Sequence, residues 1–89
     1  MIPPQKTGYT IYSKPDCVYC VKAKTLIKGK EISIEKDYPA FLDFIRPYTK
    51  TDYRLFPMIF FDGEFIGGFE EARVHHERSR TYECEKDDF

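Results

Sequence analysis

The sequence predicts a single α/β domain built on a four-stranded mixed sheet with helices on both of its faces. Two observations predict this fold class: β-prone runs alternate with helical patterns in the first half of the chain, and an Asp-Gly turn later joins two more β-prone runs into a hairpin. The expected order of elements is therefore β-α-β-α-β-β-α. The chain has 89 residues, of which 17% are aromatic, and this favours one packed core over disorder.

The first strand is predicted at residues 9–13, where β-branched and aromatic residues precede a break at Lys14-Pro15-Asp16. A helix is expected next, because apolar residues recur at helical spacing on one side while the other side is rich in lysine. The apolar side comprises Cys20, Ala23, Leu26 and Ile27. Gly29 is expected to end this helix.

A second strand and a second helix are predicted to follow. Residues 32–35 alternate between apolar and polar side chains, as in a half-buried strand. Pro39 suits the first turn of a helix whose apolar residues recur at helical spacing, namely Phe41, Phe44, Ile45 and Tyr48. Because a proline inside a helix removes a hydrogen bond, Pro47 predicts that the helix ends or kinks near Arg46. Residues 49–54 are expected to form a polar loop.

The last part of the chain is predicted to hold a β-hairpin and a third helix. Residues 58–61 and 64–66 flank Asp62-Gly63, a dipeptide that favours a tight hairpin turn. The helix between the first two strands predicts a parallel crossover, so the hairpin makes the sheet mixed. The third helix is expected from residue 69 to about residue 80, with a thin apolar face formed by Ala72 and Val74.

Composition and charge exclude several classes of protein. The 14 basic and 15 acidic residues give a net charge of −1, which predicts no nucleic-acid partner. The longest nearly apolar stretch, residues 55–61, is shorter than the roughly 18 residues that a membrane span needs. Residues 1–8 form a short polar lead without an apolar signal core, and residues 9–89 are expected to form one domain. Three cysteines do not suit a secreted disulfide framework, so a cytoplasmic protein is expected.

The pair Cys17 and Cys20, with two residues between them, indicates redox chemistry. The pair follows the first predicted strand, so Cys17 is expected at the helix N-terminus and Cys20 one turn inside. Unpaired N–H groups and the helix dipole at that end stabilise a thiolate, and Lys14 adds a positive charge nearby. Asp16 acts in the opposite electrostatic sense, or else caps the helix. Cys17 is therefore predicted to attack a disulfide, and Cys20 to resolve the mixed disulfide that results.

Other interpretations of the cysteines were compared with this one. A single Cys-x-x-Cys pair also forms half of some zinc sites, with His75, His76 or Cys84 as the remaining ligands. The chain has no second such pair, and its two histidines are adjacent rather than at ligand spacing, so no metal site is expected. The histidines and Cys84 are assigned no catalytic role.

In three segments the sequence resembles the glutaredoxin family, which has the thioredoxin-like fold. The segments are residues 12–20 (Tyr-Ser-Lys-Pro-Asp-Cys-Val-Tyr-Cys), residues 56–57 (Phe-Pro) and residues 66–70 (Ile-Gly-Gly-Phe-Glu). Their order and spacing carry the resemblance, which runs from residue 9 to about residue 72.

The resemblance implies roles for individual residues. Cys17 matches the family's nucleophile and Cys20 its resolving cysteine, while Tyr19 matches an aromatic residue that lines the glutathione groove. Lys14 matches a lysine that engages a glutathione carboxylate. Pro57 matches a proline whose preceding peptide bond is cis in the family.

The resemblance further implies a binding site for glutathione beyond the cysteines. The main chain of Phe56 is expected to pair in β fashion with the cysteinyl part of glutathione. Gly67 and Gly68 allow close approach of the ligand, and the N–H groups at Phe69 and Glu70 are expected to receive its γ-glutamyl carboxylate.

Three residues depart from the family's pattern. Val18 stands where many members have proline, which is expected to alter the redox potential without abolishing exchange. Phe56 replaces a smaller β-branched residue and is expected to narrow the groove. Glu70 stands where the family usually has Asp or Ser, and its charge opposes that of a ligand carboxylate.

The expected function is that of a dithiol glutaredoxin that reduces glutathione mixed disulfides and protein disulfides. Glutathione is the co-substrate, and no tightly bound cofactor and no membrane partner are expected. One alternative is a glutaredoxin-like electron donor, for example to ribonucleotide reductase, recharged by a thioredoxin-type reductase. A second is a module that binds an iron–sulfur cluster through Cys17 of two chains, and a third is a redox-inert scaffold.

Overall fold

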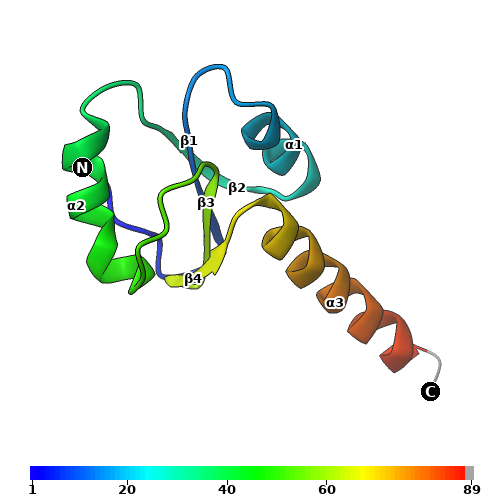
Figure 1. Ribbon diagram of the computed structural model, residues 1–89. Coiled ribbons are helices and arrows are strands. Elements are labelled where there is room, and N and C mark those ends of the chain that lie inside the picture. Colours follow the sequence, from blue (N-terminus) through cyan, green and yellow to red (C-terminus); the bar gives the residue numbers. More distant parts are fainter. Residues whose placement is uncertain (88–89) are drawn as a thin grey trace.

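The computed structural model describes the backbone of residues 1–87 and the side chains of residues 1–78, and it has the predicted order of elements (Figure 1). The elements are β1 (Tyr9–Ser13), α1 (Val18–Leu26), β2 (Gly29–Ser33), α2 (Tyr38–Thr49), β3 (Met58–Phe61), β4 (Glu64–Gly67) and α3 (Phe69–Asp87). The predicted α/β fold is therefore confirmed. None of the helices within the described residues is long and apolar enough to cross a membrane.

The four strands form one mixed sheet in the order β2-β1-β3-β4. β1 pairs with β2 in parallel, and α1 makes the crossover between them. β3 pairs antiparallel with both β1 and β4, and the predicted turn at Asp62-Gly63 joins β3 to β4. Because β1 is an inner strand, its C-terminal end lies in the middle of the sheet, and the loop that leads to α1 begins there.

Each face of the sheet carries its own hydrophobic cluster. Side chains alternate along β1 and β3, so that neighbouring residues on one strand point to opposite faces. The cluster beneath α2 contains Tyr12, Ile32, Phe41, Ile45, Met58 and Phe60. The cluster beneath α1 and α3 contains Ile11, Ala23, Ile27, Ile59 and Ala72. Figure 1 shows α2 on one side of the sheet and α1 with the start of α3 on the other, which confirms the prediction of helices on both faces.

The second strand begins earlier than the sequence predicts. Gly29 does not cap α1 but is the first residue of β2, where it lies opposite Tyr9 in the parallel register. The capping residue of α1 is Ile27, whose backbone N–H donates to the carbonyl of Ala23 at 2.9 Å. A Cβ atom on residue 29 would lie 2.5 Å from the carbonyl oxygen of Tyr9, so a glycine allows the two strands to pair at this point. The prediction was wrong because a strand contact, rather than a helix end, requires this glycine.

The second helix was expected to end or kink near Arg46, and it does not end there. α2 runs through Pro47 to Thr49, and Lys50 follows in the left-handed conformation with φ 61°. The Thr49 hydroxyl lies 3.3 Å from the carbonyl of Arg46 and 3.1 Å from that of Thr51. Thr49 is buried, as is Ile45 one turn earlier, so packing and side-chain hydrogen bonds hold the last turn although Pro47 cannot donate.

The two ends of the chain are attached to the sheet in different ways. Residues before β1 lie along it, since the Tyr12 hydroxyl donates to the carbonyl of Ile2 at 2.7 Å and the Gln5 N–H donates to the Thr10 hydroxyl at 3.0 Å. α3 extends to Asp87, beyond the expected end near residue 80. Figure 1 shows α3 starting against the sheet and then projecting away from it.

The close contact at Gly29 predicts that Gly29→Ala destabilises the fold by about 1–3 kcal/mol, because the added methyl group meets the backbone of Tyr9 and no flexible side chain. For a domain of this size, each kcal/mol corresponds to roughly 4–8 °C in Tm, measurable by thermal unfolding. The control is Lys30→Ala, an exposed position on the same strand, where a change within about 0.5 kcal/mol is expected. An equal effect of the two substitutions would contradict the assigned role of the glycine.

Candidate active site

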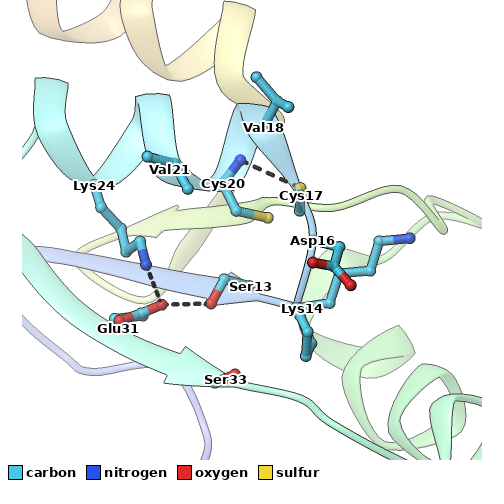
Figure 2. A pocket seen from close by; sticks show the side chains of 11 residues that line it. Ser13, Lys14, Asp16, Cys17, Val18, Cys20, Val21, Lys24, Glu31 and Ser33 are labelled. Carbon is cyan, nitrogen blue, oxygen red and sulfur yellow. Dashed lines mark hydrogen bonds and ion pairs between the residues drawn. The ribbon is translucent and has the colours of Figure 1, made fainter.

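Cys17 lies between β1 and α1, where it is the N-cap residue of the helix. Its backbone is extended, with φ −117° and ψ 107°, and its sulfur accepts the backbone N–H of Cys20 at 3.2 Å. Asp16, the other candidate for the cap, precedes it in the left-handed conformation with φ 57°. The sulfur of Cys17 is thus held at the positive end of the α1 dipole by a backbone donor, as Figure 2 shows.

Cys20 occupies the third position of α1 and is only 2% exposed, whereas Cys17 is partly exposed. Burial raises the pKa of the Cys20 thiol, and its hydrogen bond with Cys17 raises it further. Both cysteines are free thiols in this structure. The two sulfur atoms therefore differ in the way the sequence predicts, because only that of Cys17 is accessible to a substrate.

A polar hollow of about 570 Å³ lies beside the two cysteines, between α1 and the sheet. Figure 2 shows Lys24 from α1 and Ser13 from β1 directed at the same carboxylate oxygen of Glu31 on β2. Lys24 Nζ lies 2.8 Å from this oxygen, and the buried Ser13 hydroxyl donates to it at 2.7 Å. These two contacts lower the pKa of the Glu31 carboxyl. A charged network that the sequence did not predict thus lines the hollow.

A groove of about 380 Å³ contains most of the predicted substrate-binding residues. They are Tyr19, Phe56, Pro57, Gly68, Phe69 and Glu70. The Phe56-Pro57 peptide bond is cis, as expected. The sulfur of Cys17 lies 3.8 Å from the carbonyl oxygen of Phe56, so the main chain at Phe56 joins this groove to the exposed sulfur.

Lys14 lies outside that groove, on the other side of Phe56. Its ammonium group stands 5.7 Å from the centre of the Phe56 ring, and it lines a separate hollow of about 420 Å³ together with Arg54 and Tyr38. Phe56 lines both hollows. A ligand that passes Cys17 along Phe56 would therefore meet two cationic side chains and the carboxylate of Asp16 at one end.

The N-terminus of α3 forms the other end of the groove, and the N–H group of Gly68, the residue before the helix, is already paired. The carboxylate of Glu71 accepts the backbone N–H of Gly68 at 2.8 Å, the reciprocal half of a capping box. Glu70 pairs instead with Arg73, at 2.9 Å. The N–H groups that the sequence assigned to a ligand carboxylate therefore stand beside two carboxylates of the chain itself.

Tyr53 is a groove residue that the sequence did not predict. A Cβ atom on Gly68 would lie 2.3 Å from the Tyr53 hydroxyl, so this hydroxyl stands directly against the glycine. Burial raises the pKa of Tyr53, and the charge of Glu71 adds to the shift. Since Tyr53 lies in a polar loop, no periodic pattern marked it, and only the fold brings it to α3.

The two histidines considered as metal ligands form no metal-binding group with the cysteines among the described side chains. Among the described side chains, no group of three or more His, Cys, Asp or Glu residues is placed to hold a metal ion. His75 lies against Tyr9, whose hydroxyl is 2.7 Å from its Nδ1 atom, and against the ring of Phe61. The side chain of Cys84 lies outside the described residues.

Comparisons with known proteins agree with this geometry. The family model that matches is Glutaredoxin, over residues 9–66. Glutaredoxin 1 of Rickettsia bellii (strain RML369-C) is 33% identical to this chain, with 68% of each protein covered. The crystal structure of glutaredoxin 1 from Francisella tularensis, complexed with cacodylate, matches with a TM-score of 0.73 and 28% identity over 83% of this chain and 96% of its own. Oxidized glutaredoxin 2 from Chlamydomonas reinhardtii matches with a TM-score of 0.60 and 25% identity, over 89% and 79%.

The different exposure of the two cysteines predicts that iodoacetamide modifies Cys17 at pH 7 at least about tenfold faster than Cys20. The reason is that the Cys20 thiol is buried and its pKa is raised, so little of it is a reactive thiolate. Peptide mapping by mass spectrometry at several times assigns the label to each cysteine, Cys84 included. Equal rates for Cys17 and Cys20 would contradict the assigned asymmetry, and labelling in denaturant is the control.

The contact between Tyr53 and Gly68 predicts that substitutions at the two positions are not additive. Gly68→Ala forces the tyrosine ring to shift, whereas a phenylalanine leaves the added methyl group at ordinary contact distance, 3.6 Å from the ring carbon. The free energies of unfolding of Gly68→Ala, Tyr53→Phe and the double variant should show a coupling of about 0.5–2 kcal/mol. Additivity within about 0.3 kcal/mol would show that the hydroxyl does not press on the glycine.

Proposed function

Because this chain belongs to the glutaredoxin family, it is a thiol-disulfide oxidoreductase, and we propose that its substrates are glutathione mixed disulfides and protein disulfides, with glutathione as the electron donor. The observation that carries the proposal is the position of the Cys17 sulfur. It accepts the Cys20 N–H at 3.2 Å, and it faces the carbonyl of Phe56, 3.8 Å away, at the side of a groove. One partly exposed sulfur thus accepts a backbone N–H and lies beside the main chain of a groove residue.

In the first step, the Cys17 thiolate attacks the glutathionyl sulfur of a mixed disulfide. A bond forms between these two sulfur atoms, the substrate's S–S bond breaks, and the substrate leaves as a thiolate that takes a proton from solvent. The N–H of Cys20 donates to the Cys17 sulfur at the N-terminal end of α1, so the backbone holds this sulfur in place before the attack. The groove keeps the glutathionyl part beside Cys17 while the other thiol departs.

In the second step, the Cys17–glutathione disulfide is released by one of two thiols. A second glutathione thiolate attacks the bound glutathionyl sulfur, which frees Cys17 and forms glutathione disulfide. Alternatively, Cys20 loses its proton and attacks Cys17, which forms an intramolecular disulfide and releases glutathione. Because burial raises the pKa of Cys20, the route through a second glutathione is expected to dominate on small substrates.

In this proposal, glutathione extends along the groove and into the neighbouring hollow beyond Phe56. The main chain of Phe56 pairs with the cysteinyl part, beside Pro57 and the ring of Tyr19. Lys14, together with Arg54, lies where it can receive the glycine carboxylate. The γ-glutamyl part extends towards Gly68, Phe69 and Glu70 at the start of α3. Reduction of this kind belongs to a reducing compartment, so we infer a cytoplasmic location.

A second candidate function is that of a dithiol donor to proteins such as ribonucleotide reductase, recharged by a thioredoxin-type reductase. The specific observation in its favour is the Glu71 carboxylate on the Gly68 N–H, which leaves less of the α3 end for glutathione. Turnover with glutathione and glutathione reductase separates the two candidates. A protein that is reduced only by a flavoprotein reductase would favour the second.

The two-step chemistry predicts that Cys17→Ser abolishes reduction of a glutathionylated small disulfide, whereas Cys20→Ser keeps most of the activity. The reason is that glutathione can replace the buried thiol in the second step, but nothing replaces the first nucleophile. The assay couples glutathione disulfide formation to glutathione reductase. Cys84→Ser, outside the Cys17–Cys20 pair, is the control and is expected to retain the unsubstituted rate. An equal loss in Cys17→Ser and Cys20→Ser would remove the route through a second glutathione.

A further inference from the structure

The hollow beside Cys20 contains a charge pair that the proposed reaction does not use. Cys20 lines this hollow together with Lys24 and Glu31. Lys24 follows Cys20 by four residues on α1, so the two side chains are neighbours on one face of the helix. Figure 2 shows both of them extending from α1 towards the strands. A cation thus lies on the same helix face as the thiol that must lose a proton when the intramolecular disulfide forms.

Glu31 of β2 pairs with this cation. Its carboxylate oxygen lies 2.8 Å from Lys24 Nζ, and the same oxygen accepts the Ser13 hydroxyl at 2.7 Å. Because Ser13 is buried in β1, the carboxylate is held from the side of the sheet and directs the ammonium group towards it. The ion pair has no net charge, so it stabilises a thiolate at Cys20 much less than the ammonium group alone would.

A cation without such a partner does act on Cys20. Burial raises the pKa of the Cys20 thiol, whereas a hydrogen bond from the Lys14 backbone and the charge of Lys14 lower it. Within residues 1–78, no ion pair is found for Lys14. The titratable groups that line the hollow around Cys20 are Lys14, Asp16, Cys17, Lys24 and Glu31. A second unpaired cation among them would favour the Cys20 thiolate further.

We propose that Glu31 is a positioning residue that, by pairing with Lys24, withholds a counter-ion from Cys20 and so favours release by a second glutathione over closure of the intramolecular disulfide. In closure, Cys20 loses its proton to solvent and its thiolate attacks the Cys17 sulfur. An S–S bond forms between the two cysteines, the S–S bond to glutathione breaks, and glutathione leaves as a thiolate that takes a proton from solvent. This inference rests on the proposed function, because it concerns the release of the glutathione adduct.

The test measures closure by itself, in a Cys84→Ser protein that keeps both Cys17 and Cys20. The reduced protein is mixed with an excess of glutathionylated reporter peptide, without free glutathione, and samples are quenched in acid and analysed by mass spectrometry. Appearance of the glutathione adduct measures the first step, and its conversion into the intramolecular disulfide measures closure. Both rates are followed between about pH 6 and about pH 9.

The two members of the ion pair are expected to have opposite effects. Glu31→Gln keeps an oxygen that can accept the Ser13 hydroxyl but removes the charge, so closure at about pH 7 should be at least about threefold faster, with its pH profile displaced to lower pH. Lys24→Gln leaves a carboxylate without its cation, so closure should be at least about threefold slower, with its profile displaced to higher pH. Both side chains are 38% exposed, so screening by solvent keeps the effects at about this size.

The double variant Lys24→Gln, Glu31→Gln separates an electrostatic role from a structural one. It removes both charges, so closure should return to within about twofold of the unsubstituted rate, whereas structural damage would accumulate. The matched controls are Lys28→Gln and Glu64→Gln, the same changes at exposed positions that do not line the hollow, and both should leave closure unchanged.

Two results would overturn the inference, and they differ from failure of the proposed function. If Glu31→Gln and Lys24→Gln change closure in the same direction, or if the double variant is slower than either single variant, the pair has only a structural role, while the first step at Cys17 stands. If no glutathione adduct forms on Cys17, the proposed function fails, and the role of Glu31 fails with it.

Discussion

The hydrogen bond from the Cys20 N–H to the Cys17 sulfur is the constraint on which the site depends. The Cys17 sulfur caps α1 through this bond and is still partly exposed. β1 is an inner strand, so the loop that joins its C-terminal end to α1 begins in the middle of the sheet. α1 starts directly after this loop. The fold thus determines which cysteine is exposed, because the cap residue Cys17 lies outside the first turn and Cys20, three positions later, is buried.

Phe56 connects this sulfur to the rest of the site. Its carbonyl faces Cys17, its ring lies under the Lys14 ammonium, and its side chain packs against Phe41 of the core. A large ring at this position therefore separates a cationic hollow from the groove that ends at α3. A small β-branched side chain would not make these contacts, so the departure from the family's pattern is a structural feature of this site.

The sequence predicted the parts of the protein that local chemistry decides. β1, the turn at Asp62-Gly63 and the placement of Cys17 and Cys20 at a helix start all follow from residues close together in the chain. Gly29 and Pro47 misled the prediction because tertiary contacts overrode their local preferences: a parallel strand pair required the glycine, and buried Thr49 held the helix beyond the proline. Tyr53 and Glu31 were missed as site residues because each acts through a partner from another element. Glu71 was missed although its contact with the Gly68 N–H spans only three residues.

The way α3 is attached to the rest of the protein has a consequence for the groove. Phe69 and Ala72, in the first turn of this helix, pack into the hydrophobic cluster that α1 also contributes to through Ala23 and its capping residue Ile27. One turn later, His75 contacts Tyr9 and the ring of Phe61 on the sheet. A substitution that loosens the packing at Ala72 would therefore disturb both the helix that follows Cys17 and the end of the groove at Glu70.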